Sequence, residues 1–174
     1  SLNFNGKNIF SGQFYGKYSI SFKKYNGIDF SRKCFVFSGQ GSVHPGMFKN
    51  EYLANEIIRK RFEQADLLCR KYGIGKVSNY ILDSGGDDTV VNRNLCLLTL
   101  QIALFDMLMA KNVKPQIVTG HSFGEYAALA ASGIVPFKEM FDIVYHREIF
   151  SPKSNDLGYM LAVNADRKKI KEVL

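Results

Sequence analysis

A serine between two glycines is the feature of this sequence with the clearest capacity for chemistry. Ser122 lies at the centre of a Gly-x-Ser-x-Gly pattern that runs from Gly120 to Gly124. Glycine tolerates backbone conformations that a Cβ atom forbids, so this spacing permits a sharp turn from a strand into a helix. Such a turn exposes the serine hydroxyl at a helix N-terminus, where free N–H groups can stabilise an oxyanion. The pattern predicts the nucleophile elbow of an acyl-transfer enzyme.

The residues on either side of this serine fit such a turn. The segment at 114–118 starts with a lysine and a proline and becomes β-branched, which predicts a short buried strand. The segment at 123–132 is rich in Ala and Leu and stops at Gly133, which predicts a helix. A bare Gly-x-Ser-x-Gly pattern occurs often by chance, and these flanking elements make the functional interpretation specific.

A second junction between a strand and a turn lies far upstream. The apolar run at 34–37 predicts a buried parallel strand, and the order Ser-Gly-Gln-Gly-Ser follows at 38–42. Glycines on both sides of Gln40 let backbone N–H groups approach a ligand closely, and the Gln40 side chain could fix the turn. Taken alone, these residues are better explained by a simple loop between a strand and a helix.

Helical spacings occupy much of the remaining chain. Residues 47–72 predict a helix that ends at Gly73, and residues 95–110 are apolar nearly all round, which predicts a buried helix beside the sheet. Pro136 opens a further helix that runs to about Phe150. The apolar stripe of that helix consists of Phe137, Met140, Phe141 and Val144.

The end of the sequence completes an alternating order of elements. A polar turn is predicted at 151–158, a strand at 159–163, and a basic helix at 165–174 that Asn164 would cap. The alternation of strands and helices indicates an α/β protein with a parallel sheet.

Arg147 lies at the edge of the apolar stripe that starts after Pro136. A guanidinium group against apolar surface is costly unless an anion meets it. The position therefore predicts a fork that binds a carboxylate in a pocket. The alternative is an arginine whose stem packs on apolar surface, or one that pairs with a nearby acid.

Composition sets outer limits on function. A chain of 174 residues, 46% of them hydrophobic, can bury one core, and no dense Lys/Arg run accompanies the net charge of +7. We therefore expect an ordinary basic surface, with neither nucleic acid nor a membrane as partner. Cys34, Cys69 and Cys96 have no metal-ligand spacing, so no metal site is predicted and all three are interpreted as reduced core thiols. A polar N-terminal segment with no signal-peptide pattern favours a cytoplasmic protein.

Taken together and in order, these motifs resemble the malonyl-CoA:acyl-carrier-protein transacylase family. The resemblance is carried by residues 35–42, 45–47 and 120–125, by Arg147 and by residues 158–163. The order Ser-Gly-Gln-Gly-Ser followed by Pro-Gly-Met is more similar to the acyltransferase domains of polyketide synthases and type I fatty acid synthases. The likeness extends from residue 34 to residue 174.

The resemblance implies a two-step acyl exchange. Ser122 would attack the thioester of malonyl-CoA, and the acyl-enzyme would pass its acyl group to the thiol of an acyl carrier protein. Backbone N–H groups of Gln40 and Phe123 would form the oxyanion hole, and Arg147 would bind the carboxylate of malonate. His121 would be a supporting residue and not the base. No bound cofactor is implied, and an adjacent ketosynthase domain is a further expected neighbour.

The resemblance also implies a fold and a division of the chain. Residues 1–33 would be an extension or linker, and residues 34–156 would form an α/β-hydrolase-like core with a parallel sheet. Residues 157–174 would begin a ferredoxin-like small subdomain. Two departures stand out. Val43 occupies a position where the family often has glutamine, and Asn94 and Leu95 stand where a Gln-Pro pair is common.

The most serious departure concerns the family's catalytic histidine. In the family this residue lies well beyond the elbow. His44, His121 and His146 do not match its position. Because general-base catalysis typically supplies about 10²–10⁴-fold, we expect these 174 residues alone to transfer acyl groups very slowly.

Two other classes of function remain open. A serine esterase or thioesterase shares Gly-x-Ser-x-Gly, but it does not explain the Gly-Gln-Gly turn or Arg147. A catalytically incomplete interaction fragment would explain the unmatched histidine, and Ser122 would then fail to acylate.

Overall fold

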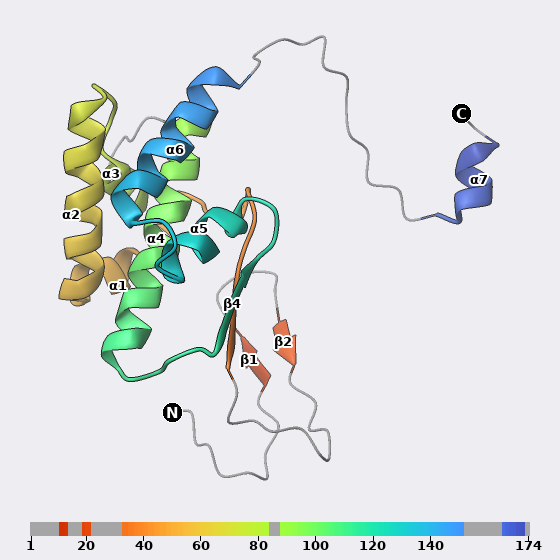
Figure 1. Cartoon of the computed structure of the whole chain (residues 1–174), viewed down its shortest axis with the longest axis horizontal. Helices are drawn as coiled ribbons and strands as arrows, with labels where there is room; N and C mark the ends of the chain where they lie inside the picture. Colours follow the sequence, from red (N-terminus) through yellow and green to blue (C-terminus); the bar gives the residue numbers. More distant parts are fainter. Residues whose placement is uncertain (1–10, 14–18, 22–32, 84–87, 152–164, 173–174) are drawn as a thin grey trace.

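The computed structural model of the chain describes residues 11–13, 19–21, 33–83, 88–151 and 165–172. An antiparallel strand pair, β1 (Ser11–Gln13) and β2 (Ser19–Ser21), comes first in the sequence. Residues 33–151 then form a mixed α/β unit in which helices surround the long helix α4 (Val90–Ala110) beside a small parallel sheet (Figure 1).

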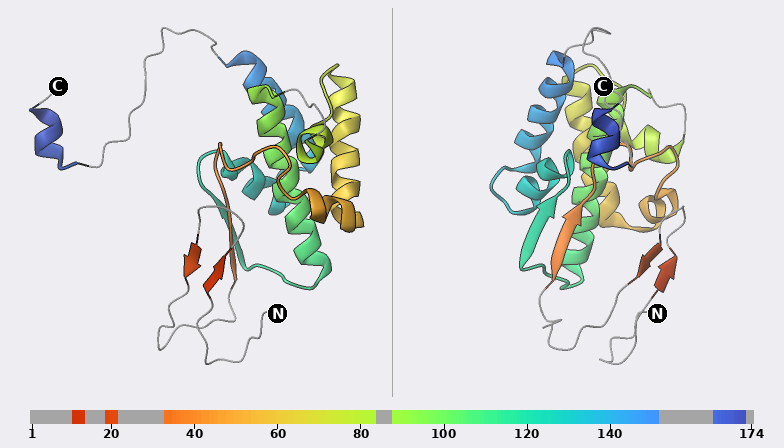
Figure 2. Two further views of the ribbon diagram at one scale, coloured as in Figure 1. Left: turned by 180° about the vertical axis from the view of Figure 1, so that it is seen from behind. Right: turned by 90° about the vertical axis from the view of Figure 1, so that its right-hand side faces the viewer.

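The parallel sheet brings the two predicted strand-to-turn junctions together. β3 (Cys34–Phe37) pairs in parallel with β4 (Ile117–Gly120), and Phe37 lies opposite Gly120 (Figure 2). Because parallel strands end at the same edge of a sheet, the turn after β3 and the turn after β4 start side by side. The predicted parallel pairing is therefore confirmed.

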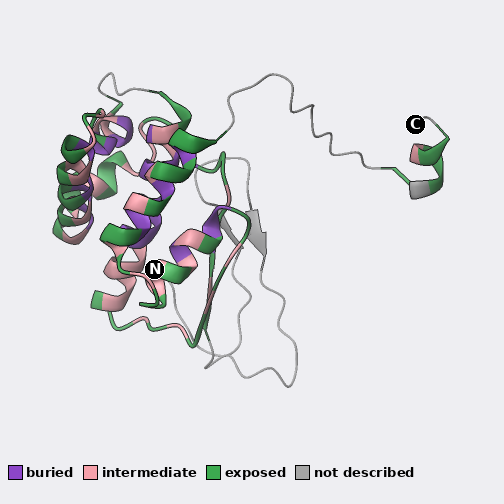
Figure 3. Ribbon diagram, turned by 45° about the horizontal axis from the view of Figure 1, so that its top comes forward, coloured by how far each residue is buried: buried purple, intermediate pink, exposed green. Residues whose placement is uncertain are grey.

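The prediction that both strands are buried is wrong. Phe35 and Phe37 face the helices, and both of their rings contact Phe105 of α4. Successive strand residues point to opposite faces, so Val36 points away from this packing and exposes 68% of its surface. Ile117, on the same outer face, exposes 58% (Figure 3). The described helices thus cover one face of the sheet.

The outer face of the sheet also explains why one cysteine departs from prediction. Cys34 pairs with Ile117 on that face and is exposed, so it is not a core thiol. Cys69 and Cys96 are buried and free, as predicted. Burial raises the pKa of the Cys69 thiol to about 11, and it also raises the pKa of Cys96, so both thiols stay protonated.

The helix predicted across residues 47–72 is two helices, α1 (Lys49–Ala54) and α2 (Glu56–Lys71). Asn55 is extended between them, and its side chain accepts a hydrogen bond from the N–H of Ile57 at 2.9 Å. An asparagine in this position caps the second helix and interrupts the first. α2 ends as predicted at Tyr72, followed by Gly73 with a φ of 64°.

A short helix, α3 (Val77–Leu82), follows α2 and was not predicted from the sequence. Asp66 of α2 holds it in place, because the Asp66 carboxylate accepts hydrogen bonds from the backbone N–H of Ser78 at 3.1 Å and from its hydroxyl at 2.6 Å. Six residues make fewer than two helical turns, which is too short for a clear period in the sequence.

α4 is the predicted buried helix, although it starts five residues earlier than expected. The Thr89 hydroxyl caps it by accepting a hydrogen bond from the N–H of Asn92 at 3.2 Å, and residues 94–103 are all buried. In the described chain, α4 alone is long and apolar enough to cross a membrane, with a mean hydropathy of 1.3. Burial of 56% of this stretch inside the fold matches the core helix of a globular domain.

α2, α4 and α6 (Phe137–Phe150) run side by side (Figure 1). Arg61 of α2 joins all three helices. Its Nε donates to Asp106 of α4 at 2.8 Å, and its guanidinium lies 4.6 Å from the ring centre of Phe137 on α6. α6 starts after Pro136 and buries Met140, Phe141 and Val144, which confirms the predicted helix and its stripe.

The last described element is α7 (Arg167–Lys171). Its cap is Asp166, whose carboxylate accepts a hydrogen bond from the N–H of Lys168 at 2.8 Å, so the predicted cap at Asn164 is wrong. The predicted strand at 159–163 and most of the predicted turn before it lie outside the described residues.

Candidate active site

The predicted elbow is present as a strained turn between β4 and α5 (Gly124–Ala131). Ser122, at the centre of the turn, has a φ of 53°. A positive φ is uncommon for a residue with a Cβ atom, and such strain clusters at active sites. The turn leaves Ser122 exposed immediately before a helix N-terminus, as the sequence predicted.

Both glycines of the pattern are required by close backbone contacts. A Cβ atom added to Gly120 would lie 2.1 Å from the carbonyl carbon of Gly124. A Cβ atom added to Gly124 would lie 2.2 Å from the carbonyl oxygen of Phe37. These distances are far below van der Waals contact, so only glycine fits at either position.

His121 ties the elbow to the neighbouring strand through its backbone. Its N–H donates to the carbonyl of Phe37 at 2.9 Å, and its carbonyl accepts from the N–H of Gly124 at 2.9 Å. The His121 residue is exposed. The backbone of His121 therefore helps to hold the turn in place.

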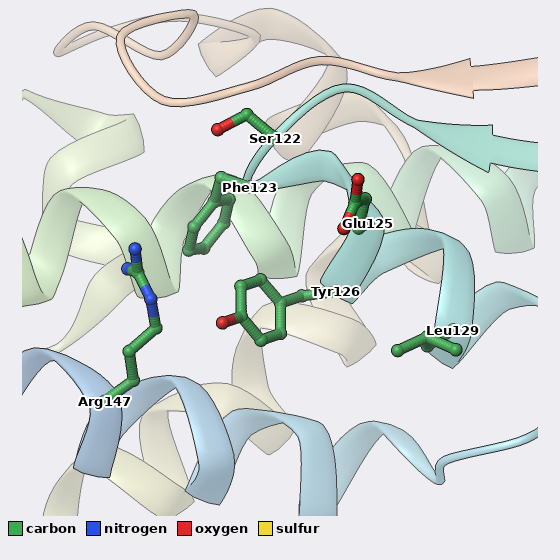
Figure 4. Close-up of a pocket in the computed structure, with 6 residues that line it drawn as sticks. All are labelled: Ser122, Phe123, Glu125, Tyr126, Leu129 and Arg147. Atoms are coloured by element: carbon green, nitrogen blue, oxygen red, sulfur yellow. The ribbon is translucent and has the colours of Figure 1, made fainter.

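A cavity of about 370 Å³ opens beside the serine (Figure 4). Its lining consists of Ser122, Phe123, Glu125, Tyr126, Leu129 and Arg147. The first five of these residues lie along the elbow and α5, whereas Arg147 reaches in from α6 (Figure 4). The structure thus brings the predicted nucleophile and the predicted carboxylate-binding arginine to one cavity.

The guanidinium of Arg147 is held by two aromatic rings and one acid. Its central carbon lies 5.6 Å from the ring centre of Tyr126 and 6.0 Å from that of Phe123. Its Nη1 forms an ion pair with Oε1 of Glu148. The Arg147 side chain is 39% exposed and that of Glu148 only 6%. Arg147 therefore pairs with a nearby acid, as one of the two interpretations from the sequence predicts, and it also lines the cavity.

The turn at 38–42 packs directly against the elbow. A Cβ atom added to Gly39 would lie 3.0 Å from Nδ1 of His121 and 3.5 Å from Cβ of Ser122. The backbone of this turn therefore runs next to the serine, and a larger residue at Gly39 would push the two turns apart.

Two side chains other than Gln40 fix that turn. The Ser42 hydroxyl donates to the carbonyl of Gly39 at 2.7 Å. Gln101 of α4 donates through Nε2 to the carbonyl of Ser38 at 2.8 Å. The Gln40 side chain is exposed and makes no hydrogen bond to any residue that the structure describes. The predicted bracing role belongs to Ser42 and Gln101.

The two predicted oxyanion donors lie against different cavities. Within the described ranges, no hydrogen-bond acceptor is found for the backbone N–H of Phe123 or of Gln40. Phe123 lines the cavity of Ser122, whereas Gln40 lines a second cavity of about 490 Å³ together with Val43 and Asn94. The Nδ2 atom of Asn94 is buried there with no partner among the described residues.

A base for the serine is not found among the described side chains. No hydrogen bond joins the Ser122 hydroxyl to any of the three histidines. His44 lies 3.0 Å from the carbonyl of Pro45 through Nδ1, and His146 packs between the rings of Tyr145 and Phe150. In the described part of the chain there is also no group of three metal-ligating side chains.

Comparison with known proteins identifies a family for most of the chain. Residues 34–173 match the family described as "Acyl transferase domain". A probable polyketide synthase 8/35 from Dictyostelium discoideum is 32% identical over 162 residues, which is 89% of this chain and 6% of that protein. The chain therefore spans a small part of the length of this relative.

Two solved structures show the same arrangement of elements. A loading acyltransferase from the avermectin modular polyketide synthase superposes with a TM-score of 0.61 and 30% identity, covering 64% of this chain and 36% of that one. A malonyl-transacylase solved in complex with a type II polyketide synthase acyl-carrier protein gives a TM-score of 0.58 and 27% identity, covering 66% and 37%. The match over residues 34–173 shows that this chain belongs to the acyl transferase domain family.

Proposed function

We propose that this chain carries the nucleophile of an acyltransferase that moves a malonyl group from CoA to the thiol of an acyl carrier protein. One observation carries the proposal, namely that the strained Ser122 and the cation Arg147 line the same cavity. The malonyl-transacylase relative with its bound carrier protein supports the choice of acceptor. The product would enter polyketide or fatty acid synthesis.

In the first half-reaction, Ser122 Oγ forms a bond to the thioester carbonyl carbon and the C–S bond to CoA breaks. The serine proton leaves through a general base and ends on the CoA thiol. We assign that proton transfer to a base outside the described residues, because no described histidine bonds to Ser122. The second half-reaction reverses these steps, with the carrier thiol attacking the serine ester.

Charge develops on the carbonyl oxygen during both attacks. Phe123 is the N-cap residue of α5 and follows the nucleophile directly. We propose its backbone N–H as the first oxyanion donor. Gln40 is proposed as the second donor, because its neighbour Gly39 packs against Ser122. Arg147 would bind the free carboxylate of the malonyl group.

Several expectations from the family resemblance belong to the same proposal. These are the α/β-hydrolase-like core, the linker at 1–33, the large subdomain at 34–156 and the ferredoxin-like start at 157–174. A cytoplasmic location and an adjacent ketosynthase domain are also part of the proposal.

The proposed function is tested by separating the two half-reactions in the full-length protein. Incubation with malonyl-CoA should give one covalent malonyl adduct on the protein and release one equivalent of CoA. Addition of a carrier protein with its phosphopantetheine thiol should then remove the adduct and give malonyl-carrier. Hydrolysis of simple esters without CoA-dependent labelling would instead favour a serine esterase, and no adduct at all would favour an interaction fragment.

Removal of the Arg147 charge should affect malonyl loading far more than acetyl loading. Arg147→Ala alone is a poor test, because it leaves Glu148 buried and unpaired, at a typical cost of about 3–5 kcal/mol in stability. A better test compares the double variant Arg147→Gln/Glu148→Gln with the single variant Glu148→Gln. Charge-assisted hydrogen bonds contribute about 1.5–3 kcal/mol each, so malonyl loading should fall on the order of 10²-fold.

The measurement is the rate of acyl-enzyme formation with malonyl-CoA and with acetyl-CoA, side by side. Acetyl loading should change little, since an acetyl group has no carboxylate for the arginine to bind. Equal losses on both substrates would show that Arg147 supports the fold and does not recognise the acyl group.

A further inference from the structure

Glu148 is a buried charge that the proposed reaction does not use. Among the described residues it is the only charged residue in the buried class. Acidic side chains are almost never buried unless something pairs with them, because removing a charge from water is costly. The surroundings of Glu148 therefore have to contain a compensating cation.

That cation is Arg147, which is predicted to bind the substrate carboxylate. Its Nη1 pairs with Oε1 of Glu148, and within the described ranges Glu148 has no other ion-pair partner. Arg147 lines the cavity beside Ser122, whereas Glu148 does not. Glu148 thus contacts the guanidinium from the protein interior, and the substrate carboxylate would contact the guanidinium from the cavity.

We infer that Glu148 sets the acyl selectivity of this site by neutralising Arg147, which weakens the preference for acyl groups that carry a carboxylate. This inference rests on the function proposed above. A malonyl carboxylate that binds Arg147 also comes close to the Glu148 carboxylate, and two like charges at that range repel each other. A neutral acyl group such as acetyl meets no such repulsion.

The pairing leaves Arg147 partly available. A guanidinium has five N–H donors, and Glu148 engages Nη1. A malonyl group can therefore still be bound, but by an arginine whose charge is already balanced. Glu148 lowers the ratio of malonyl to acetyl loading without abolishing malonyl loading.

The same contact has a competing explanation, in which Glu148 mainly orients the guanidinium. Glutamine separates the two explanations, since its amide oxygen can still accept a hydrogen bond from Nη1 while the negative charge is gone. Alanine removes both the charge and the acceptor. If the negative charge determines selectivity, Glu148→Gln and Glu148→Ala change the ratio of malonyl to acetyl loading in the same direction. If orientation of the guanidinium matters instead, only Glu148→Ala weakens malonyl loading.

The test compares acyl-enzyme formation from malonyl-CoA and acetyl-CoA in the full-length protein and its Glu148→Gln variant. We expect the ratio of malonyl to acetyl loading to rise about tenfold or more, with acetyl loading nearly unchanged. Glu139→Gln is the matched control, because Glu139 is exposed in the first turn of the same helix. It should leave the ratio unchanged. An unchanged or lower ratio in Glu148→Gln would overturn the inference.

A binding measurement keeps this inference separate from the proposed chemistry. In a Ser122→Ala background, calorimetry gives the Kd values of malonyl-CoA and acetyl-CoA with and without Glu148→Gln. We expect Glu148→Gln to tighten malonyl-CoA alone. If Ser122 never acylates but this shift occurs, the proposed function fails and the role of Glu148 stands. If Ser122 acylates and the shift is absent, the inference fails alone.

Discussion

Replacing Gly124 by alanine is expected to destabilise the fold by about 3 kcal/mol or more. The added Cβ atom would lie 2.2 Å from the carbonyl oxygen of Phe37 and 2.8 Å from that of Ser38. Both are backbone atoms of β3 and the turn after it, so no side-chain rotation relieves the clash. The two turns that form the site would have to separate. Urea denaturation of the full-length protein measures the loss.

Gly133 provides the control for this substitution. It has a φ of 77°, but an added Cβ atom would meet nothing within 4 Å. Gly133→Ala therefore tests the backbone strain alone, which typically costs about 1 kcal/mol. If Gly124→Ala proved no more damaging than Gly133→Ala, the close contact between the elbow and β3 would not exist.

Replacing Ser122 by alanine is expected to abolish acyl transfer while the fold stays intact. The hydroxyl makes no hydrogen bond to any described residue, so its loss leaves no buried partner unsatisfied. The methyl group of alanine tolerates the φ of 53° about as well as the serine side chain does. The free energy of unfolding should therefore change little, whereas transfer to the carrier protein should fall to the level without enzyme.

Ser122→Gly extends this test to the strain in the turn. Glycine adopts a positive φ without a Cβ penalty, so this variant should gain about 1 kcal/mol in stability and still lose transfer. A loss of stability in Ser122→Gly would show that the serine side chain holds the turn together.

Local features of the site were predictable from the sequence because they depend on neighbouring residues. The elbow depends on glycines at 120 and 124, and the helix after it ends just before Gly133. Both features are encoded within short segments of the sequence. The parallel pairing of β3 with β4 followed from the alternation of elements. Pro136 marked the start of α6 correctly.

Features that depend on distant packing were not predictable in the same way. Apolar runs indicated buried strands, but the sequence does not say how many faces of a sheet are covered, and Val36 and Ile117 are exposed. Gln101 lies in a helix that is otherwise apolar nearly all round, and it holds the turn at 38–42 by donating to the carbonyl of Ser38. A polar residue in a helix that is otherwise apolar all round is the signal that could have singled it out.

Glu148 shows the same limit at the level of one residue. Adjacent residues on a helix point in directions about 100° apart, so the sequence gives no reason to expect a pair between Arg147 and Glu148. The pair forms because Glu148 is buried and the long Arg147 side chain can reach it. Its proposed effect on selectivity depends on the burial of Glu148 and on the position of Arg147 at the cavity, which the sequence does not show.

The most direct test of the account is to locate the malonyl adduct. The full-length protein and its Ser122→Ala variant are incubated with malonyl-CoA, digested, and mapped by tandem mass spectrometry. We expect one malonyl group on the Ser122 side chain of the wild type and none on the variant. An adduct at another residue, or one that survives in the Ser122→Ala variant, would contradict the assignment of Ser122 as the nucleophile.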